Sequence, residues 1–176
     1  MSTPKGILVN GYVLLKVNSE TEALLERGYG IIENGYIKLK PVEALFLLHH
    51  NKIEVYSSDK KLNFSELFDI FSSLDPELYV KYMVYEDLRK RGFVVKEGFS
   101  KRAEFRLYEG YKQSKVAKYL VNCFVEGKRI DLRLLAQIVD EALRSEKELI
   151  LAIVDKEGNI SYYSVTKFIP KYSRMQ

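Results

Sequence analysis

Residues 75–97, DPELYVKYMVYEDLRKRGFVVKE, carry a strong local signal, because they specify a complete helix and the strand that follows it. Asp75 belongs to the residue types that cap helix N-termini, Pro76 suits the first helical position, and Gly92 is typical of the residue after a helix. Between them, apolar residues recur at helical spacing and form one face for burial. They are Val80, Met83, Val84 and Leu88.

Upstream of this helix, short strands alternate with helices. The pairs Asn10 and Gly11, and Asn34 and Gly35, are two-residue turn signals between apolar runs, and each predicts a β-hairpin. Ser19 is expected to open the first helix and Gly28 to close it. Helices are expected at residues 19–28, 41–52 and 63–74, and a strand at residues 53–56.

Downstream, a second set of strands surrounds one helix. Residues 148–155 are nearly all apolar, as expected for a strand covered on both faces. We therefore expect an α/β protein with a small α+β N-terminal domain, residues 1–75, and a C-terminal domain, residues 76–176, in which helices pack on a mixed sheet. The expected elements are strands at 93–98, 103–110, 117–127, 148–155 and 160–168, and a helix at 131–145 capped by Asp131.

Composition places the chain among globular proteins. Its 176 residues are 47% hydrophobic, which is enough to fill a core, and the net charge of +4 is compatible with nucleic-acid binding as well as with ordinary soluble proteins. The single cysteine, Cys123, excludes an internal disulfide and favours a reducing, cytoplasmic location. The N-terminal apolar runs are short and interrupted, so we expect neither a signal peptide nor a membrane span.

Several catalytic classes lack their motifs here. The sequence contains no nucleophile elbow, phosphate-binding glycine loop, HExxH motif or Cys/His pair for covalent catalysis. The two histidines, His49 and His50, are adjacent, and no Cys/His cluster has zinc-ligand spacing, so we expect no metal and no cofactor. The acid-x-lysine strings at residues 59–61 and 126–128 are expected in turns, which argues against a metal-dependent nuclease.

Four segments, in this order, resemble the archaeal tRNA-splicing endonuclease (tRNA-intron lyase) family. They are PVEALFLLHHNKIEV (41–55), VYEDLRKRGFVVKEGFSKRAEFRLYEG (84–110), AKYLVNCF (117–124) and ELILAIVDKEGNISYYSVT (148–166). The resemblance implies that residues 76–176 form the tRNA-intron endonuclease catalytic-like domain. It also implies metal-independent cleavage of precursor tRNA at bulge-helix-bulge elements, which leaves a 2′,3′-cyclic phosphate and a 5′-hydroxyl.

By this resemblance, the family's catalytic tyrosine falls at Tyr108, its lysine at Lys147 and its histidine at Val116. In the family the tyrosine acts as general base, the histidine as general acid, and the lysine steadies the charge on phosphorus oxygens. Valine cannot donate a proton, and a positioned acid or base is worth roughly 10² to 10⁴ in rate. Lys115 and Lys118 are poor substitutes, because a solvated ammonium of pKa about 10.4 is a weak acid at neutral pH.

A basic cluster supplies candidate RNA-binding residues, which are Arg89, Lys90, Arg91, Lys101 and Arg102. The alternative is that the cations ending the helix oppose its dipole and only face solvent. Many active relatives carry an arginine that stacks on an RNA base at the position that holds Asp140 here. A carboxylate at that position would repel phosphate.

Some members of the family are four-subunit assemblies of two different chains, one catalytic and one structural. The resemblance implies that this chain is a structural subunit, inactive alone, that joins a histidine-containing catalytic subunit in a heterotetramer on precursor tRNA. The alternatives are a self-sufficient ribonuclease with another acid and an RNA-binding protein without cleavage activity. Candidate interface residues are Tyr162, Tyr163, Val165 and Phe168 in the last strand and Asp155 and Glu157 in the turn before it.

Overall fold

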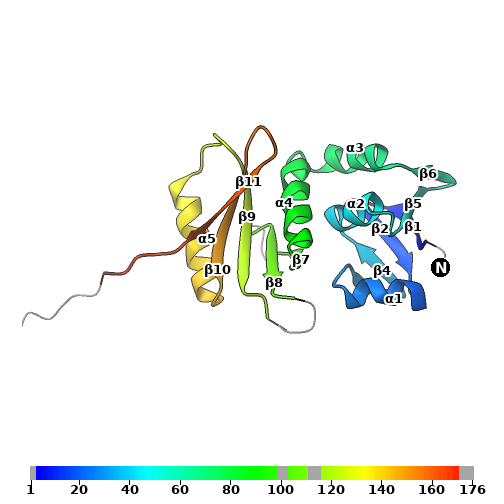
Figure 1. Ribbon diagram of the computed structural model, residues 1–176, viewed down its shortest axis with the longest axis horizontal. Helices are drawn as coiled ribbons and strands as arrows, with labels where there is room; N and C mark the ends of the chain where they lie inside the picture. Colours follow the sequence, from blue (N-terminus) through cyan, green and yellow to red (C-terminus); the bar gives the residue numbers. More distant parts are fainter. Residues whose placement is uncertain (1–2, 99–102, 111–115, 171–176) are drawn as a thin grey trace, which may run out of the picture.

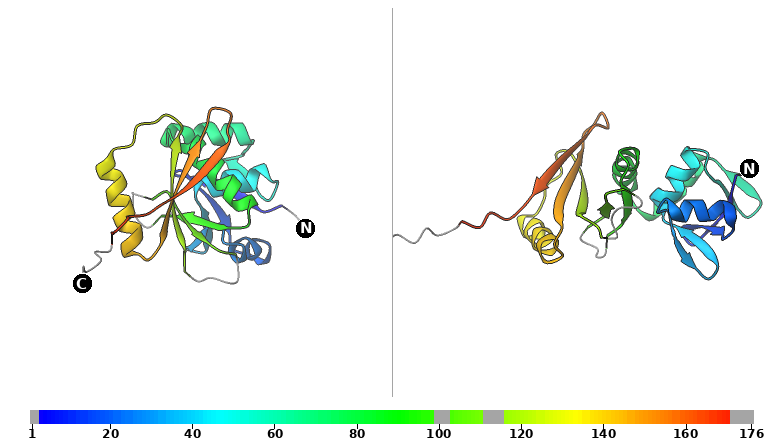
Figure 2. Two further views of the ribbon diagram at one scale, coloured as in Figure 1. Left: turned by 60° about the vertical axis from the view of Figure 1, so that its left-hand side comes forward. Right: turned by 60° about the horizontal axis from the view of Figure 1, so that its bottom comes forward.

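The computed structural model describes residues 3–98, 103–110 and 116–170 and confirms the α/β class. Two sheets lie toward opposite ends of an elongated molecule, with helices between them (Figures 1 and 2). The first half consists of β1 (Lys5–Val9), β2 (Tyr12–Lys16), α1 (Ser19–Glu26), β3 (Ile31–Glu33), β4 (Tyr36–Leu39), α2 (Pro41–His49), β5 (Glu54–Ser57), β6 (Lys60–Leu62) and α3 (Phe64–Leu74). The second half consists of α4 (Leu78–Lys90), β7 (Val94–Glu97), β8 (Phe105–Tyr108), β9 (Tyr119–Val125), α5 (Leu132–Arg144), β10 (Glu148–Val154) and β11 (Ile160–Val165).

The N-terminal sheet has the strand order β3-β4-β2-β1-β5-β6, in which β1 and β5 run parallel. Both predicted hairpins are present. Asn10 and Gly11 have φ values of 48° and 78°, and Asn34 and Gly35 have 51° and 79°, as a tight turn with two left-handed residues requires. The short β6 was not predicted, because the charged sequence Lys60–Leu62 carries little strand signal.

Helix α1 begins at Ser19, as expected, and the helix before β7 begins later than expected. The N-cap of α1 is Asn18, whose side chain accepts hydrogen bonds from the amides of Glu20 and Thr21. α4 begins at Leu78 after Glu77, so Asp75 is not its N-cap. The Asp75 carboxylate accepts from the Glu77 amide at 3.0 Å, so it shapes the turn before the helix instead.

The C-terminal sheet has the order β11-β10-β9-β8-β7, with β9 and β10 parallel and the other pairs antiparallel. Helices α5 and α4 lie on opposite sides of this sheet (Figure 1). Asp131 caps α5 as predicted, through the amides of Arg133 and Leu134. The helix buries Ile138, Val139 and Ala142 against Leu149 and Leu151 of β10.

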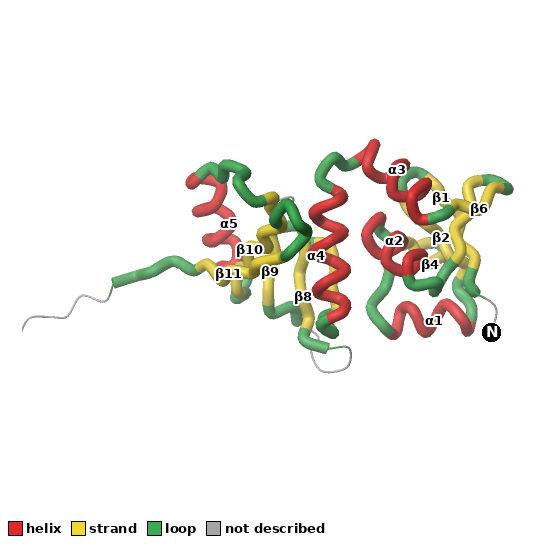
Figure 3. The backbone as a smooth tube through the Cα atoms, turned by 45° about the horizontal axis from the view of Figure 1, so that its top comes forward, coloured by secondary structure: helices red, strands yellow, loops and turns green. Residues whose placement is uncertain are grey.

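A single buried cluster connects the two halves. It runs from the N-terminal sheet through α2 and α4 to the near face of the C-terminal sheet, and includes Leu47, Tyr85 and Val95, each at most 1% exposed. Helices α2 and α4 pack side by side at the centre of this cluster (Figure 3). The apolar surface that each half would expose alone is therefore covered by the other half.

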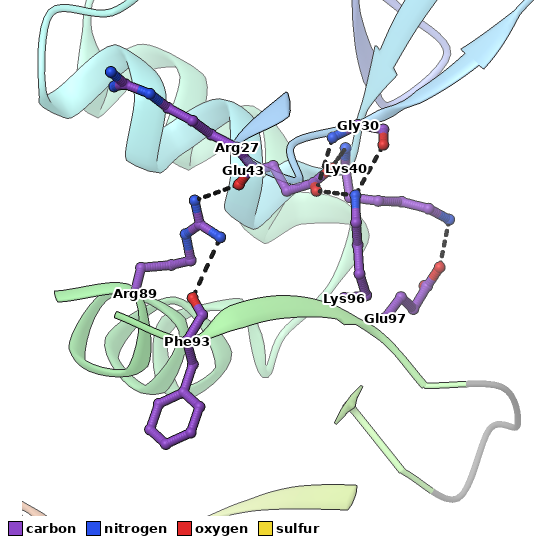
Figure 4. A network of polar contacts seen from close by, with 8 residues as sticks. All are labelled: Arg27, Gly30, Lys40, Glu43, Arg89, Phe93, Lys96 and Glu97. Carbon is purple, nitrogen blue, oxygen red and sulfur yellow. Dashed lines mark hydrogen bonds and ion pairs between the residues drawn. The ribbon is translucent and has the colours of Figure 1, made fainter. Parts of the chain in front are cut away.

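Polar contacts reinforce this junction around Glu43, a residue that is 4% exposed (Figure 4). Its carboxylate accepts from the amides of Gly30 at 3.0 Å and Lys40 at 2.9 Å. Lys96 of β7 lies 3.4 Å from the same carboxylate and donates to the Gly30 carbonyl oxygen at 2.8 Å. The buried charge is thus paired and hydrogen-bonded, as burial requires.

Candidate catalytic end of the C-terminal sheet

Three strand ends meet at one end of the C-terminal sheet. The Lys118 amide donates to the Leu107 carbonyl oxygen at 2.9 Å, and the Glu148 amide donates to the Lys118 carbonyl oxygen at 3.0 Å. Tyr108 ends β8 and Lys147 immediately precedes β10, so the two residues lie at one level of the sheet on either side of Lys118. The fold therefore brings the two predicted site positions to the same end of the sheet.

Val116 lies two residues before Lys118 and so belongs to the same end of the sheet. Its side chain is 66% exposed, and its aliphatic character leaves it without an exchangeable proton. Both histidines of the chain lie elsewhere, at the C-terminal end of α2. No described residue therefore supplies an imidazole at this end of the sheet.

Tyr108 and Lys147 have ordinary structural surroundings. Tyr108 is half-buried beside a hollow of about 290 Å³, and the Arg106 guanidinium carbon lies 5.9 Å from the centre of its ring. The Lys147 ammonium donates to the Ser145 carbonyl oxygen at 2.8 Å, which helps to end α5. To reach a phosphate group, the Lys147 ammonium would have to leave or share its contact with the Ser145 carbonyl oxygen.

Lys118 is held in a cluster that sequence reasoning did not find. Its ammonium lies 3.0 Å from the Glu109 carboxylate, which also accepts from the Tyr119 hydroxyl at 3.2 Å. The hydrogen bond to Glu109 raises the pKa of Lys118, with a further contribution from Tyr119. Lys118 is thus an even weaker proton donor than a free lysine, which argues against it as a substitute acid.

A larger cavity of about 670 Å³ lies between the halves, away from this sheet end. Its wall includes Tyr12, Pro41, Leu74 and Glu104.

Burial raises the pKa of the Glu104 carboxyl in this wall, although that side chain accepts from the Cys123 amide at 3.1 Å. The cavity is not lined by Tyr108, Val116 or Lys147, so its position does not support a catalytic role for the cavity.

Comparison with known proteins identifies the family of this fold. Residues 78–162 match the model of the tRNA intron endonuclease catalytic C-terminal domain, and residues 5–68 match that of its N-terminal domain. A tRNA-splicing endonuclease of Methanococcus maripaludis is 37% identical, over 81% of either chain. One from Methanothermobacter thermautotrophicus is 33% identical over 92% of this chain and 95% of its own. An EndA-like protein of Methanopyrus kandleri is 33% identical over 94% and 98%.

The chain belongs to the tRNA-splicing endonuclease family. The resemblance noted from the sequence is therefore confirmed, and the family assigns the chain to the cleavage of introns from precursor tRNA. Among the described helices, none is both long enough and apolar enough to cross a lipid bilayer.

In this endonuclease fold, Arg89 holds the junction together. Its guanidinium donates to the carbonyl oxygens of Arg27 at 3.0 Å and Phe93 at 3.3 Å (Figure 4). It also lies over the Tyr29 ring, 4.0 Å from the centroid. These contacts link α4 to the first half, and a bound RNA would have to compete with them.

The next two basic residues of the endonuclease chain pair with acids one helical turn earlier. Lys90 lies 3.2 Å from the Glu86 carboxylate and Arg91 lies 2.7 Å from the Asp87 carboxylate. Both cations are more than half exposed, so these pairs are weak and either side chain can leave. Lys101 and Arg102, the other predicted RNA-binding residues, lie outside the described residues.

Strand β11 forms an edge of the endonuclease sheet and presents two different faces. Tyr162 points to its own α4 and donates to the Asp87 carboxylate at 2.7 Å, and burial, together with this bond, raises its pKa. Val165 packs partly against the cluster under α5. Tyr163 and Phe168 are 57% and 85% exposed. Of the predicted interface residues on this strand and beyond it, these two offer free apolar surface.

The turn before β11 is closed by hydrogen bonds between its own residues. Asp155 accepts from the amide and the side-chain nitrogen of Asn159, each at 2.8 Å, and the side-chain bond lowers the pKa of its carboxyl. Glu157 is exposed at the tip of this turn. Asp155 therefore serves the turn itself, whereas Glu157 is available to a partner.

Asp140 lies on α5, beside a shallow hollow of about 290 Å³ that it shares with Gln137, Arg144 and Ser145. Its carboxylate is 3.5 Å from the Lys167 ammonium, and its side chain is 40% exposed. A cation from the segment after β11 thus approaches the position where the resemblance predicts an RNA-stacking arginine. The carboxylate and this lysine together leave little net charge there.

Proposed function

We propose that this chain is a structural, non-catalytic subunit of a tRNA-splicing endonuclease. The observation that carries the proposal is the valine at position 116, at the sheet end that also holds Tyr108 and Lys147. The chemistry proposed for the complex is metal-independent and leaves a 2′,3′-cyclic phosphate and a 5′-hydroxyl. This chemistry needs an acid that protonates the leaving oxygen. Replacing that acid with an aliphatic side chain lowers the cleavage rate by roughly 10² to 10⁴.

The catalytic partner is proposed to be a histidine-bearing relative in a heterotetramer. The edge strand β11 supports this assembly, because an edge strand presents unpaired backbone groups that a second chain can bind. Tyr163 and Phe168 add exposed aromatic surface beside that edge. Glu157 extends from the preceding turn as a candidate contact for a basic cleft in the partner.

The domain division at about residue 75 belongs to the same proposal, with residues 1–75 as the N-terminal domain and 76–176 as the C-terminal domain. The matched ranges 5–68 and 78–162 support this boundary. We also propose a cytoplasmic location, where precursor tRNA is available to the complex. The reduced, buried thiol of Cys123 is compatible with that compartment.

A cleavage assay tests the subunit assignment. Purified chain is incubated with an intron-containing precursor tRNA, alone and together with a histidine-bearing homologue from the same cell. The homologue alone is the matched control. Cleavage that requires both chains supports the proposal. Efficient cleavage by this chain alone would show a self-sufficient ribonuclease, and binding without cleavage in any mixture would show an RNA-binding protein; either result contradicts the proposal.

Two substitutions test whether the sheet end is vestigial. Lys147→Ala in the mixed complex is expected to leave the cleavage rate within about twofold of the parent, because the proposed chemistry occurs in the partner. A loss of a hundredfold or more would place Lys147 in the reaction. Val116→His is the complementary change. Without the partner, we expect this variant to remain inactive, since Asp140 stays where, by the resemblance, many active relatives carry an arginine.

Assembly is tested separately with Tyr163→Asp. A carboxylate on this exposed side of β11 is expected to weaken association with the partner in size-exclusion chromatography, because burying an unpaired charge is costly. Glu157→Ala tests the turn in the same measurement. Unchanged association of the Tyr163→Asp chain would rule out this face of β11 as the interface.

A further inference from the structure

His49, His50 and Glu86 come together from the two helices that join the halves of the molecule. His49 ends α2 and His50 is its C-cap, whereas Glu86 lies on α4, which packs beside α2 (Figure 3). One potential ligand atom from each residue lies within 4.8 Å of the others. Two imidazole nitrogens and a carboxylate oxygen form a donor set typical of zinc sites.

The spacing of one pair already suits an ion. The Nδ1 atom of His49 is 3.4 Å from the Oε1 atom of Glu86. Two ligands bound at about 2.0 to 2.1 Å to a tetrahedral zinc ion are about 3.3 to 3.4 Å apart. The His49 side chain is 52% exposed, which leaves access for an ion and freedom for small rotations.

The ring of His50 is held by a hydrogen bond to the backbone. Its Nδ1 atom is 2.9 Å from the carbonyl oxygen of Phe46. A carbonyl oxygen can only accept, so Nδ1 carries the proton and the lone pair is on Nε2. A backbone carbonyl that binds the second ring nitrogen is a common support of metal-bound histidine.

The carboxylate of Glu86 provides a further observation in favour of a metal site. Its Oε1 atom is buried and has no hydrogen bond of good geometry from the described residues, although Lys90 approaches to 3.2 Å, the Tyr82 hydroxyl interacts with the same carboxylate, and the side chain as a whole is 14% exposed. A buried carboxylate oxygen without a hydrogen bond is costly, and coordination of a metal ion would offset that cost. The Tyr82 hydroxyl, 2.8 Å from His49 Nδ1, would be displaced from that nitrogen.

We propose that His49, His50 and Glu86 bind one Zn²⁺ ion, with the fourth position open to water. The ion would join α2 to α4 and so strengthen the junction between the halves. Its role is structural and does not depend on the proposed function in tRNA splicing, because its ligands lie on elements other than the strand ends that carry Tyr108 and Lys147.

Calorimetric titration of the full chain with ZnCl₂ tests the site, with protein that carries no histidine tag and has been stripped of metal with a chelator. We expect saturable binding of one ion per chain and none with Mg²⁺, which prefers oxygen ligands. At a free zinc concentration one hundred times the dissociation constant, the melting temperature should rise by roughly 5 to 10 °C. Absence of saturable Zn²⁺ binding overturns the proposal.

Substitutions at the site and beside it should change the affinity for Zn²⁺ in opposite directions. Glu86→Gln and His50→Ala should weaken Zn²⁺ binding by about tenfold or more. Lys90→Ala should instead tighten it, because that ammonium competes with the ion for Glu86. Glu66→Gln, a carboxylate on α3, is the matched control and should bind like the parent. Circular dichroism verifies that each variant is folded. Parent-like affinity in folded Glu86→Gln and His50→Ala would refute the site.

Discussion

Two glutamates at the junction between the halves illustrate how much depends on the partners of a single carboxylate. Glu43 is buried and accepts from two backbone amides, with Lys96 beside it. Glu104 accepts from the Cys123 amide, but burial dominates and raises its pKa. The first carboxylate therefore has hydrogen-bond donors on both of its oxygens, whereas burial disfavours the charged form of the second.

Glu43→Gln is expected to lower the free energy of unfolding by about 2 to 4 kcal/mol. The amide keeps one acceptor oxygen, turns a donor toward a backbone N–H, and leaves Lys96 without its counter-ion. Urea denaturation measures the loss. Glu126→Gln, an exposed glutamate, serves as the control and should change stability by less than about 0.5 kcal/mol. Equal stability of the two variants would contradict the role given to Glu43.

Glu104 predicts a pH dependence. Because its folded pKa is raised, the folded protein keeps the proton to higher pH than the unfolded chain, so this group makes stability fall as pH rises from the unfolded value of about 4.3 through the folded value. Glu104→Gln should remove that fall. The difference in unfolding free energy between variant and parent should therefore grow in favour of the variant from about pH 4 to pH 7. A difference that stays constant with pH would disprove this assignment.

Among the elements, β11 shows that neighbouring residues of one strand serve opposite purposes. Side chains alternate between the faces of a strand, so Tyr162 contacts α4 while Tyr163 projects to solvent. The sequence expectation treated both tyrosines as interface candidates. The structure ties Tyr162 to its own subunit and leaves Tyr163 available to a partner.

Tyr162→Phe should therefore cost about 1 to 1.5 kcal/mol of stability, because Asp87 loses a hydrogen bond while the ring is kept. Tyr163→Phe should have little effect on the isolated chain. Thermal denaturation of the two variants side by side makes the comparison. A larger loss for Tyr163→Phe would mean that the two faces of β11 have been assigned the wrong way round.

At the scale of the whole molecule, one apolar cluster runs through α2 and α4 and joins the two halves, and a smaller cluster lies under α5. Such a core couples the unfolding of the two halves, although the family models match them as separate ranges. The junction polar network around Glu43 and Arg89 adds to this coupling (Figure 4).

Calorimetry of the isolated chain should accordingly show a single unfolding transition. Leu47→Ala, at a position 1% exposed on α2, should lower the free energy of unfolding by about 2 to 5 kcal/mol and shift that whole transition. Hydrogen exchange should report the loss in β9 and β10 as well as in the N-terminal sheet. Two separate transitions would show that the halves unfold independently.

Local sequence patterns were sufficient to predict many of the secondary-structure elements. Turn pairs such as Asn34 and Gly35, the Asp131 cap and the apolar periodicity of α5 act over a few residues, so the hairpins and most helices could be predicted. The α/β class and the family followed from the order of these segments. The absence of a proton donor at Val116 is a matter of residue identity and needs no coordinates.

Contacts between distant segments required the folded chain. Arg89 meets the Arg27 carbonyl oxygen, and Glu86 meets His49, across helices whose separation in sequence carries no periodic signal. The start of α4 was misplaced because Asp75 bonds within a turn that continues from α3. These features arise from long-range packing, which selects among side-chain contacts that local patterns leave equally possible.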